Sequence, residues 1–217
     1  MNKIFPILAI ETSGDLCSVA AMMDEKCFFE ININQKHIHS EKIIDMIDYV
    51  ISISKTELKN FSQIAVSIGP GSFTGLRIGL SVAKGLALGS NLPIVPVPSI
   101  DALALEISDF LINKKFGILK SASLEDLYYA TFESQNKFYK KLDDASLIKK
   151  ESLEEKIKGF DIIFADKEFV SNVRIISGPR AIYIAKWSYL FGQELLTYDY
   201  DYLEPYYLKQ FKVRGNE

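Results

Sequence analysis

The chain has 217 residues, 48% of them apolar, which is enough to bury one large core or two small lobes and excludes an intrinsically disordered protein. The 25 Lys and Arg residues nearly balance the 28 Asp and Glu residues, for a net charge of -3. The positive residues form nothing larger than pairs such as Lys114-Lys115 and Lys149-Lys150. Strong binding of nucleic acid by this chain alone is therefore not expected, because it requires a concentrated basic face.

The cysteines and the apolar runs predict a cytoplasmic protein. Cys17 and Cys27 both fall in apolar stretches without a metal-binding or redox spacing, so we expect two inert core thiols in a reducing compartment. Glu11 interrupts the first apolar run too early for a signal peptide. Arg77 and Lys84 interrupt the longest later one, so no membrane span is expected.

The first half of the chain predicts a strand meander followed by alternating helices and strands. We expect strands at 7–10, 17–23, 27–33, 64–68 and 92–97, and helices at 40–55, 73–88 and 99–111. Ser40 and Ser99 are expected to be helix N-caps. Strand and helix in alternation are typical of an α/β lobe with parallel strand pairing.

The two longer helices show unusual surfaces. The helix over 40–55 has one narrow polar stripe, and its apolar arc is on the order of 220°, about twice the ~100° that a core-facing helix needs. Something besides the lobe's own core is therefore expected to cover it. In the second helix Gly75, Gly79, Ala83 and Ala87 recur every four residues. Such a smooth ridge permits the close approach of another helix, and the sequence leaves open whether the ridge meets only the chain's own sheet.

The second half repeats the order of the first in a shorter form. Strands are expected at 116–119, 127–132, 138–142, 162–165 and 174–176, and helices at 153–158 and 181–196. This order predicts an internal duplication with a boundary near residues 100–115. The aromatic tail, 203–209, is expected to dock on the protein or on a partner.

Two phrases carry a resemblance to a known family. The first phrase is Ile7-Leu8-Ala9-Ile10-Glu11-Thr12-Ser13 with Cys17-Ser18-Val19-Ala20, and the second is Ile68-Gly69-Pro70-Gly71-Ser72-Phe73-Thr74-Gly75-Leu76-Arg77-Ile78-Gly79. With Ala83-Lys84-Gly85-Leu86-Ala87, they resemble the TsaB family, also called YeaZ. The match is close over the first hundred residues and thin afterwards. At 121–123 this chain has Ser-Ala-Ser where the family has Asp-Ala-Arg, which removes a charged pair.

The resemblance implies an actin/Hsp70-like (ASKHA) α/β fold of two duplicated, ribonuclease H-like lobes. We expect an N-terminal lobe, 1–108, that carries the partner-binding helices, and a smaller, degenerate C-terminal lobe, 109–217. The resemblance also implies that the chain is a non-catalytic scaffold in the formation of N6-threonylcarbamoyladenosine at position 37 of tRNAs that read ANN codons. The chain would bind the carbamoyltransferase TsaD and, with it, the ATPase TsaE. Alone it would form a homodimer, and it would meet tRNA only within the complex.

The family is known to use its N-terminal helices for self-association and for TsaD. The residues expected at this interface are therefore Ile43, Met46, Ile47, Val50, Phe73, Gly75, Leu76, Gly79, Leu80, Ala83 and Ala87. We expect Gly79→Leu to weaken association and to leave the fold largely intact.

Residues for metal chemistry are missing where the resemblance would place them. TsaD-like enzymes carry a His-x-x-x-His pair at the start of the helix that here begins near Ser99, and an i, i+4 spacing puts both rings on one face. The matching positions are Ser99 and Leu103, and leucine cannot bind a metal. His37 and His39 lack a third ligand and are expected to be polar loop residues. No metal site is expected.

Residues for nucleotide or nucleophilic chemistry are also incomplete. Glu11, Thr12 and Ser13 occupy the first phosphate loop of the fold, but the second lobe offers only 177–180, so a degenerate loop and no cofactor are expected. The turn 69–72 is either a tight strand-to-helix turn or an anion site at a helix N-terminus. The competing hypothesis is an active enzyme of the same superfamily, either kinase-like and ATP-dependent or a metal-dependent carbamoyltransferase.

Overall fold

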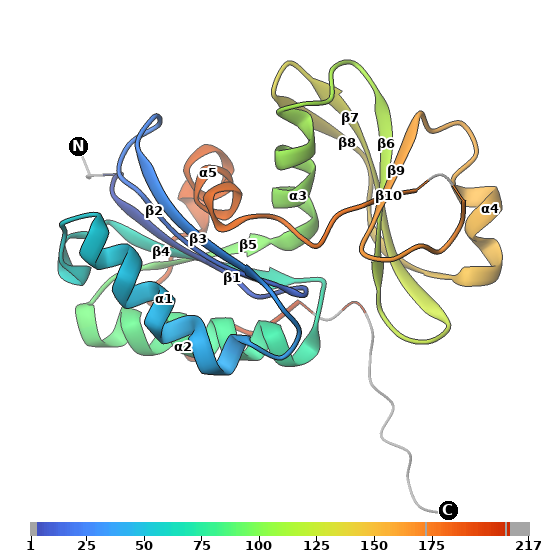
Figure 1. Ribbon diagram of the computed structural model, residues 1–217. Coiled ribbons are helices and arrows are strands. Elements are labelled where there is room, and N and C mark those ends of the chain that lie inside the picture. Colours follow the sequence, from blue (N-terminus) through green and yellow to red (C-terminus); the bar gives the residue numbers. More distant parts are fainter. Residues whose placement is uncertain (1–3, 172, 207, 209–217) are drawn as a thin grey trace, which may run out of the picture.

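The structure is a computed structural model that describes residues 4–171, 173–206 and 208 (Figure 1). The first lobe contains a sheet of β1 (Ile7–Glu11), β2 (Leu16–Met22), β3 (Phe28–Asn34), β4 (Gln63–Gly69) and β5 (Ile94–Pro98) in the order β3-β2-β1-β4-β5. The first three strands form the predicted antiparallel meander, whereas β4 and β5 pair in parallel beside β1. The strands β1 and β2 are buried along their whole length, because helices cover both faces of the sheet.

Helices from distant parts of the chain cover this sheet. The helices α1 (His39–Ile53) and α2 (Phe73–Ser90) lie on one face. The helices α3 (Ser99–Ser108) and α5 (Ala181–Phe191) cover the other face, and short 3-10 turns at Leu58–Asn60 and Gln193–Leu195 follow α1 and α5. The chain therefore returns to the first sheet after completing the second lobe. The division at 108/109 remains a prediction.

The second sheet has the topology of the first. It contains β6 (Lys115–Ser121), β7 (Asp126–Gln135), β8 (Phe138–Lys149), β9 (Ile162–Ala165) and β10 (Val173–Ile175) in the order β10-β9-β6-β7-β8. The first strand of this set again pairs with an antiparallel neighbour on one side and a parallel neighbour on the other. One face packs on α3, and the other packs on a segment that includes the 3-10 turn Lys150–Ser152 and α4 (Leu153–Lys156). The predicted duplication is confirmed.

Both predictions of a serine N-cap are wrong. The helix α1 starts one residue before Ser40, its N-cap residue is Ile38, and no side chain caps it. Ser99 is the first residue of α3, and its Oγ accepts a hydrogen bond from the Gly69 N–H at 3.0 Å. The serine that does cap a helix is Ser72, whose Oγ accepts from the Gly75 N–H at 3.2 Å.

The two cysteines differ in exposure. Cys17 is buried in β2, and burial, with a smaller contribution from Glu11, raises the pKa of its thiol to about 11. Cys27 is exposed, so the prediction of two core thiols is wrong for this residue. The reason is local, because Cys27 belongs to the turn between β2 and β3, where its N–H donates to Asp24 Oδ1 at 2.8 Å.

The tail docks on the first lobe. Tyr200 Oη donates to the Leu92 carbonyl at 2.7 Å, and the Tyr206 N–H donates to the Ile68 carbonyl at 2.7 Å. Of the predicted tail, 203–209, residues 207 and 209 lie outside the described residues. No helix in the described part of the chain is long and apolar enough to cross a membrane.

Candidate functional site: the cleft between the lobes

The loop after β1 is buried and held by its own lobe. Glu11 and Thr12 are 0% exposed, and Ser13 is 1% exposed. Thr12 Oγ1 donates to the Gly75 carbonyl at 2.8 Å, which ties the loop to α2. The Ser13 N–H donates to Glu11 Oε1, and Glu11 Oε2 has no hydrogen-bond partner among the described residues. Burial raises the pKa of the Glu11 carboxyl group.

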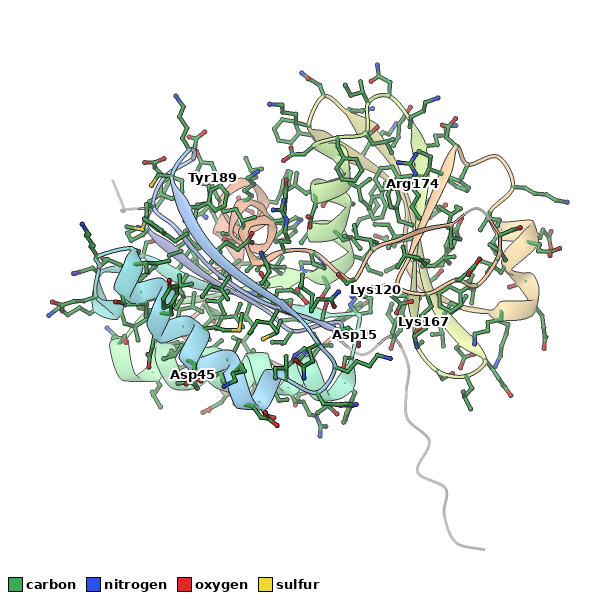
Figure 2. All side chains as sticks on the ribbon, in the orientation of Figure 1. Asp15, Asp45, Lys120, Lys167, Arg174 and Tyr189 are labelled. Atoms are coloured by element: carbon green, nitrogen blue, oxygen red, sulfur yellow. The ribbon has the colours of Figure 1, made fainter. Side chains whose placement is uncertain are left out.

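A lysine from the second lobe reaches this loop. Lys120, on β6, is 3% exposed, and its Nζ donates to Ser13 Oγ at 3.0 Å. Burial lowers the pKa of this ammonium group, and the nearby carboxylates Glu11, Asp166 and Asp15 oppose that shift. The positive charge therefore lies on the residues expected to form a phosphate loop. Figure 2 shows Lys120 close to Asp15 and Lys167 where the two lobes meet.

The sequence contained a signal for Lys120 that pattern reading missed. Side chains alternate along a strand, so Lys120 shares a face with Phe116 and Ile118, which are both fully buried. A lysine on a strand face whose other residues are buried is itself expected to be buried, and a buried charge needs a polar partner. The neighbouring Ser121, where the family has an aspartate, donates to Asp166 through its N–H at 2.9 Å and its Oγ at 3.2 Å.

The cleft between the lobes has a volume of about 360 Å³ and is lined by loops of both lobes. Ser13, Gly14 and Ser72 contribute from the first lobe, and Lys120 and Ser177 from the second. The lobes touch at its edge, because a Cβ added at Gly14 would lie 2.5 Å from the Ser177 carbonyl oxygen. The segment 177–180, expected to be the weak second phosphate loop, therefore packs against the first loop.

The positions considered for a metal have structural roles. Leu103 is 1% exposed and lies in the core between α3 and the second sheet. His39 is buried, and its Nε2 lies 2.8 Å from the Gly14 carbonyl oxygen, so the prediction of a polar loop residue is wrong for it. His37 is exposed. Among residues 4–171, 173–206 and 208, no three His, Cys, Asp or Glu side chains are placed to hold a metal ion.

The residues expected at the partner interface are mostly inside the first lobe. Only Phe73, at 36%, is exposed, and the buried members of the set are Ile43, Met46, Ile47, Val50, Gly75, Leu76, Gly79, Leu80, Ala83 and Ala87. The apolar arc of α1 is broad because this helix packs against both the sheet and α2. Most of the arc is therefore covered within the lobe, and Ile44, at 48% exposed, is left open to solvent.

The glycine and alanine ridge faces the chain's own sheet. A Cβ added at Gly75 would lie 2.1 Å from the Thr12 carbonyl oxygen, and one at Gly79 would lie 2.3 Å from Thr12 Oγ1. The close approach that these glycines allow is thus the approach of α2 to the end of β1. The expectation that Gly79→Leu leaves the fold intact is wrong, because the larger side chain has no space.

The faces of α1 and α2 that point away from the sheet carry exposed apolar side chains and two glycines. Ile44 and Tyr49 of α1 are 48% and 56% exposed, and Leu88 of α2 is 74% exposed. Around Gly85 and Gly89 nothing lies within 4 Å of an added Cβ. These residues form the surface that the two helices offer to solvent.

Comparison with known proteins identifies the family of the chain. A family model described as "TsaD: tRNA N6-adenosine threonylcarbamoyltransferase" matches residues 27–161. A protein of Buchnera aphidicola subsp. Schizaphis graminum, named "tRNA threonylcarbamoyladenosine biosynthesis protein TsaB", is 33% identical over 153 residues, which are 70% of this chain and 72% of the relative. The chain belongs to the TsaB family.

A second relative and a solved structure extend the comparison. The TsaB protein of Escherichia coli is 38% identical over 98 residues, which are 45% of this chain and 42% of that protein. The crystal structure of YeaZ from Pseudomonas aeruginosa superposes with a TM-score of 0.77 at 20% identity, over 94% of this chain and 99% of that one. This likeness, with the two sheets of matching strand order, confirms the predicted fold of two duplicated α/β lobes.

Proposed function

We propose that this chain acts in the biosynthesis of threonylcarbamoyladenosine in tRNA, as a non-catalytic partner subunit of a TsaD transferase. The observation that carries the proposal is the match to TsaB-named proteins, which reaches 33% identity over 72% of one relative. The near-neutral charge of the chain fits a subunit that meets tRNA only within a complex. The ATPase TsaE is the further partner that the family resemblance implies.

The residues that line the cleft between the lobes support a non-catalytic role. The Lys120 ammonium group lies on Ser13, in the loop where an actin-like enzyme would hold a phosphate, and Leu103 replaces a metal-binding histidine. Hydrolysis of ATP by the purified chain, lost in Glu11→Gln, would overturn this part of the proposal and favour the active-enzyme alternative.

The outward face of α1 and α2 is the proposed TsaD-binding surface. It has exposed apolar side chains at Ile44, Tyr49 and Leu88, and its glycines, Gly85 and Gly89, leave space for a partner helix to approach closely. The buried residues that the sequence predicted at the interface then contribute indirectly to binding, because they hold the two helices on the sheet. In the absence of TsaD, the same face would pair two copies of the chain.

Co-elution with the cognate TsaD tests the partner assignment. We expect one complex peak for the natural chain and loss of that peak for Gly85→Leu, because the leucine fills the space on the outward face. Ser146→Leu, on exposed β8, is the matched control and should still co-elute. Failure of the natural chain to co-elute would refute the partnership, and full binding by Gly85→Leu would refute the surface. Light scattering with and without TsaD separates the homodimer from the heterodimer.

A further inference from the structure

The two lobes share the helix α3 as an apolar connection. Ala102 and Leu105 of α3 belong to the core on the first sheet, whereas Leu103 and Ile107 belong to a separate core with the second sheet. Figure 1 shows α3 between the two sheets. Separating α3 from either sheet would expose apolar surface to water, so this connection between the lobes is a firm one.

The contacts between the lobes at the cleft are of a different kind. Lys120 Nζ donates to Ser13 Oγ at 3.0 Å. Gly14 lies so close to the Ser177 carbonyl group that the space for a Cβ is missing. A hydrogen bond across a cleft can be exchanged for one to water, whereas an apolar core cannot be opened without exposing its surface. The cleft is therefore the side on which the lobes can separate.

Carboxylates of both lobes lie near the Lys120 ammonium group. Glu11 and Asp15 belong to the first lobe and Asp166 to the second, and all three attract the charge on Lys120. Asp15 and Asp166 line the cleft together with Lys120. Without the ammonium group, carboxylates of the two lobes would repel each other across the cleft. Lys120 thus supplies attraction between the lobes at the place where the carboxylates supply repulsion.

The loop that receives Lys120 is fixed to the first lobe. The Ser13 carbonyl accepts a hydrogen bond from the Ser72 N–H at 2.8 Å, and Thr12 Oγ1 donates to the Gly75 carbonyl at 2.8 Å. Both hydrogen bonds tie the loop to the start of α2. Because the loop is held in this way, it cannot follow the second lobe. Movement of the second lobe away from the first therefore has to break the hydrogen bond of Lys120.

We propose that Lys120 and the contact between Gly14 and Ser177 form a latch that holds the two lobes closed, and that loss of the latch lets the second lobe rotate about α3. Rotation about α3 widens the cleft without separating either apolar core, as in hinge motions of other two-lobed proteins. The inference goes beyond the proposed function and does not depend on it, because each contact lies within one chain. Failure of TsaD binding would therefore leave this inference standing.

Double electron–electron resonance on the full-length chain measures the separation of the lobes. Spin labels are attached at Asp45→Cys on α1 and Glu154→Cys on α4, which are exposed positions in different lobes. A Cys27→Ser background removes the exposed native thiol, and buried Cys17 stays unlabelled. We expect one narrow distance distribution for this reference chain. Lys120→Met should shift the distribution to longer distances by several ångströms and broaden it, because the carboxylates of the two lobes then repel each other.

Gly14→Ala tests the latch without changing a charge. The added Cβ would lie 2.5 Å from the Ser177 carbonyl oxygen, so this variant should also give longer distances between the labels. Lys167→Met is the matched control, because Lys167 lines the same cleft but is exposed, and it should keep the reference distribution.

The outcomes of this experiment separate the latch from a merely structural role of Lys120. Cooperative urea unfolding shows whether Lys120→Met folds, and Gly14→Ala decides the question if it does not. An unchanged distribution in Gly14→Ala or in a folded Lys120→Met would overturn the proposal. A broad distribution in the reference chain, or an equal shift in Lys167→Met, would overturn it as well.

Discussion

Two alanine substitutions in α2 distinguish a helix surface that meets the chain's own sheet from one that meets solvent. At Gly79 the added Cβ would lie 2.3 Å from Thr12 Oγ1. The overpacking costs about 1–3 kcal/mol, and displacing Thr12 from the Gly75 carbonyl costs about 1 kcal/mol more. The better helix propensity of alanine returns about 1 kcal/mol. Gly79→Ala should therefore destabilise the fold by about 1–3 kcal/mol.

Gly85→Ala is the matched control in the same helix. Nothing lies within 4 Å of a Cβ added at Gly85, so only the propensity gain remains. This variant should be about 0.8–1.0 kcal/mol more stable than the natural chain. Urea unfolding of the isolated chain measures both values, and the difference between the variants should be about 2–4 kcal/mol. Equal effects at the two positions would refute the assignment of the Gly75 and Gly79 ridge to the sheet.

Three further predictions concern buried charge and thiol exposure. Lys120→Met should cost about 0.5–3 kcal/mol less stability in the Glu11→Gln background than in the natural chain, because the two buried charges attract each other. Additive effects in urea unfolding would contradict this attraction. Because burial raises the pKa of Glu11 above the ordinary 4.5, the folded chain binds the extra proton, and this group's stability is lost as pH rises from 4.5 through the folded pKa. Denaturation across that range should show a slope that Glu11→Gln removes. A thiol reagent should label exposed Cys27 in the native chain and reach buried Cys17 only after unfolding, so equal native labelling would contradict the assigned burial.

The order of elements could be predicted from local patterns alone. The strands of the first lobe differ from the predicted ones by one or two residues at their ends, because runs such as Ile64 to Ile68 are apolar except at Ser67 and are followed by turn residues. Helix ends were less predictable. The start of α1 depends on where the backbone leaves β3, and Ser40 signals a cap that the fold does not use.

The candidate sites could be predicted only in part. The loop Glu11, Thr12, Ser13 was identified from its position after β1, and it does line the contact between the lobes. Its partner Lys120 lies 107 positions away from Ser13, so no local pattern could connect them. The same holds for His39 and Gly14, which meet because the first turn of α1 folds back over the loop.

The sequence by itself determined the family, the duplicated α/β topology and the absence of a metal-binding pair at Ser99 and Leu103, because these depend on residue type and periodicity along the chain. Only the tertiary structure decided which side of a helix meets the sheet. Apolar residues at helical spacing, such as those of α1, fit a core and an interface equally well. The choice between the two depends on the distance to other segments, which periodicity does not contain.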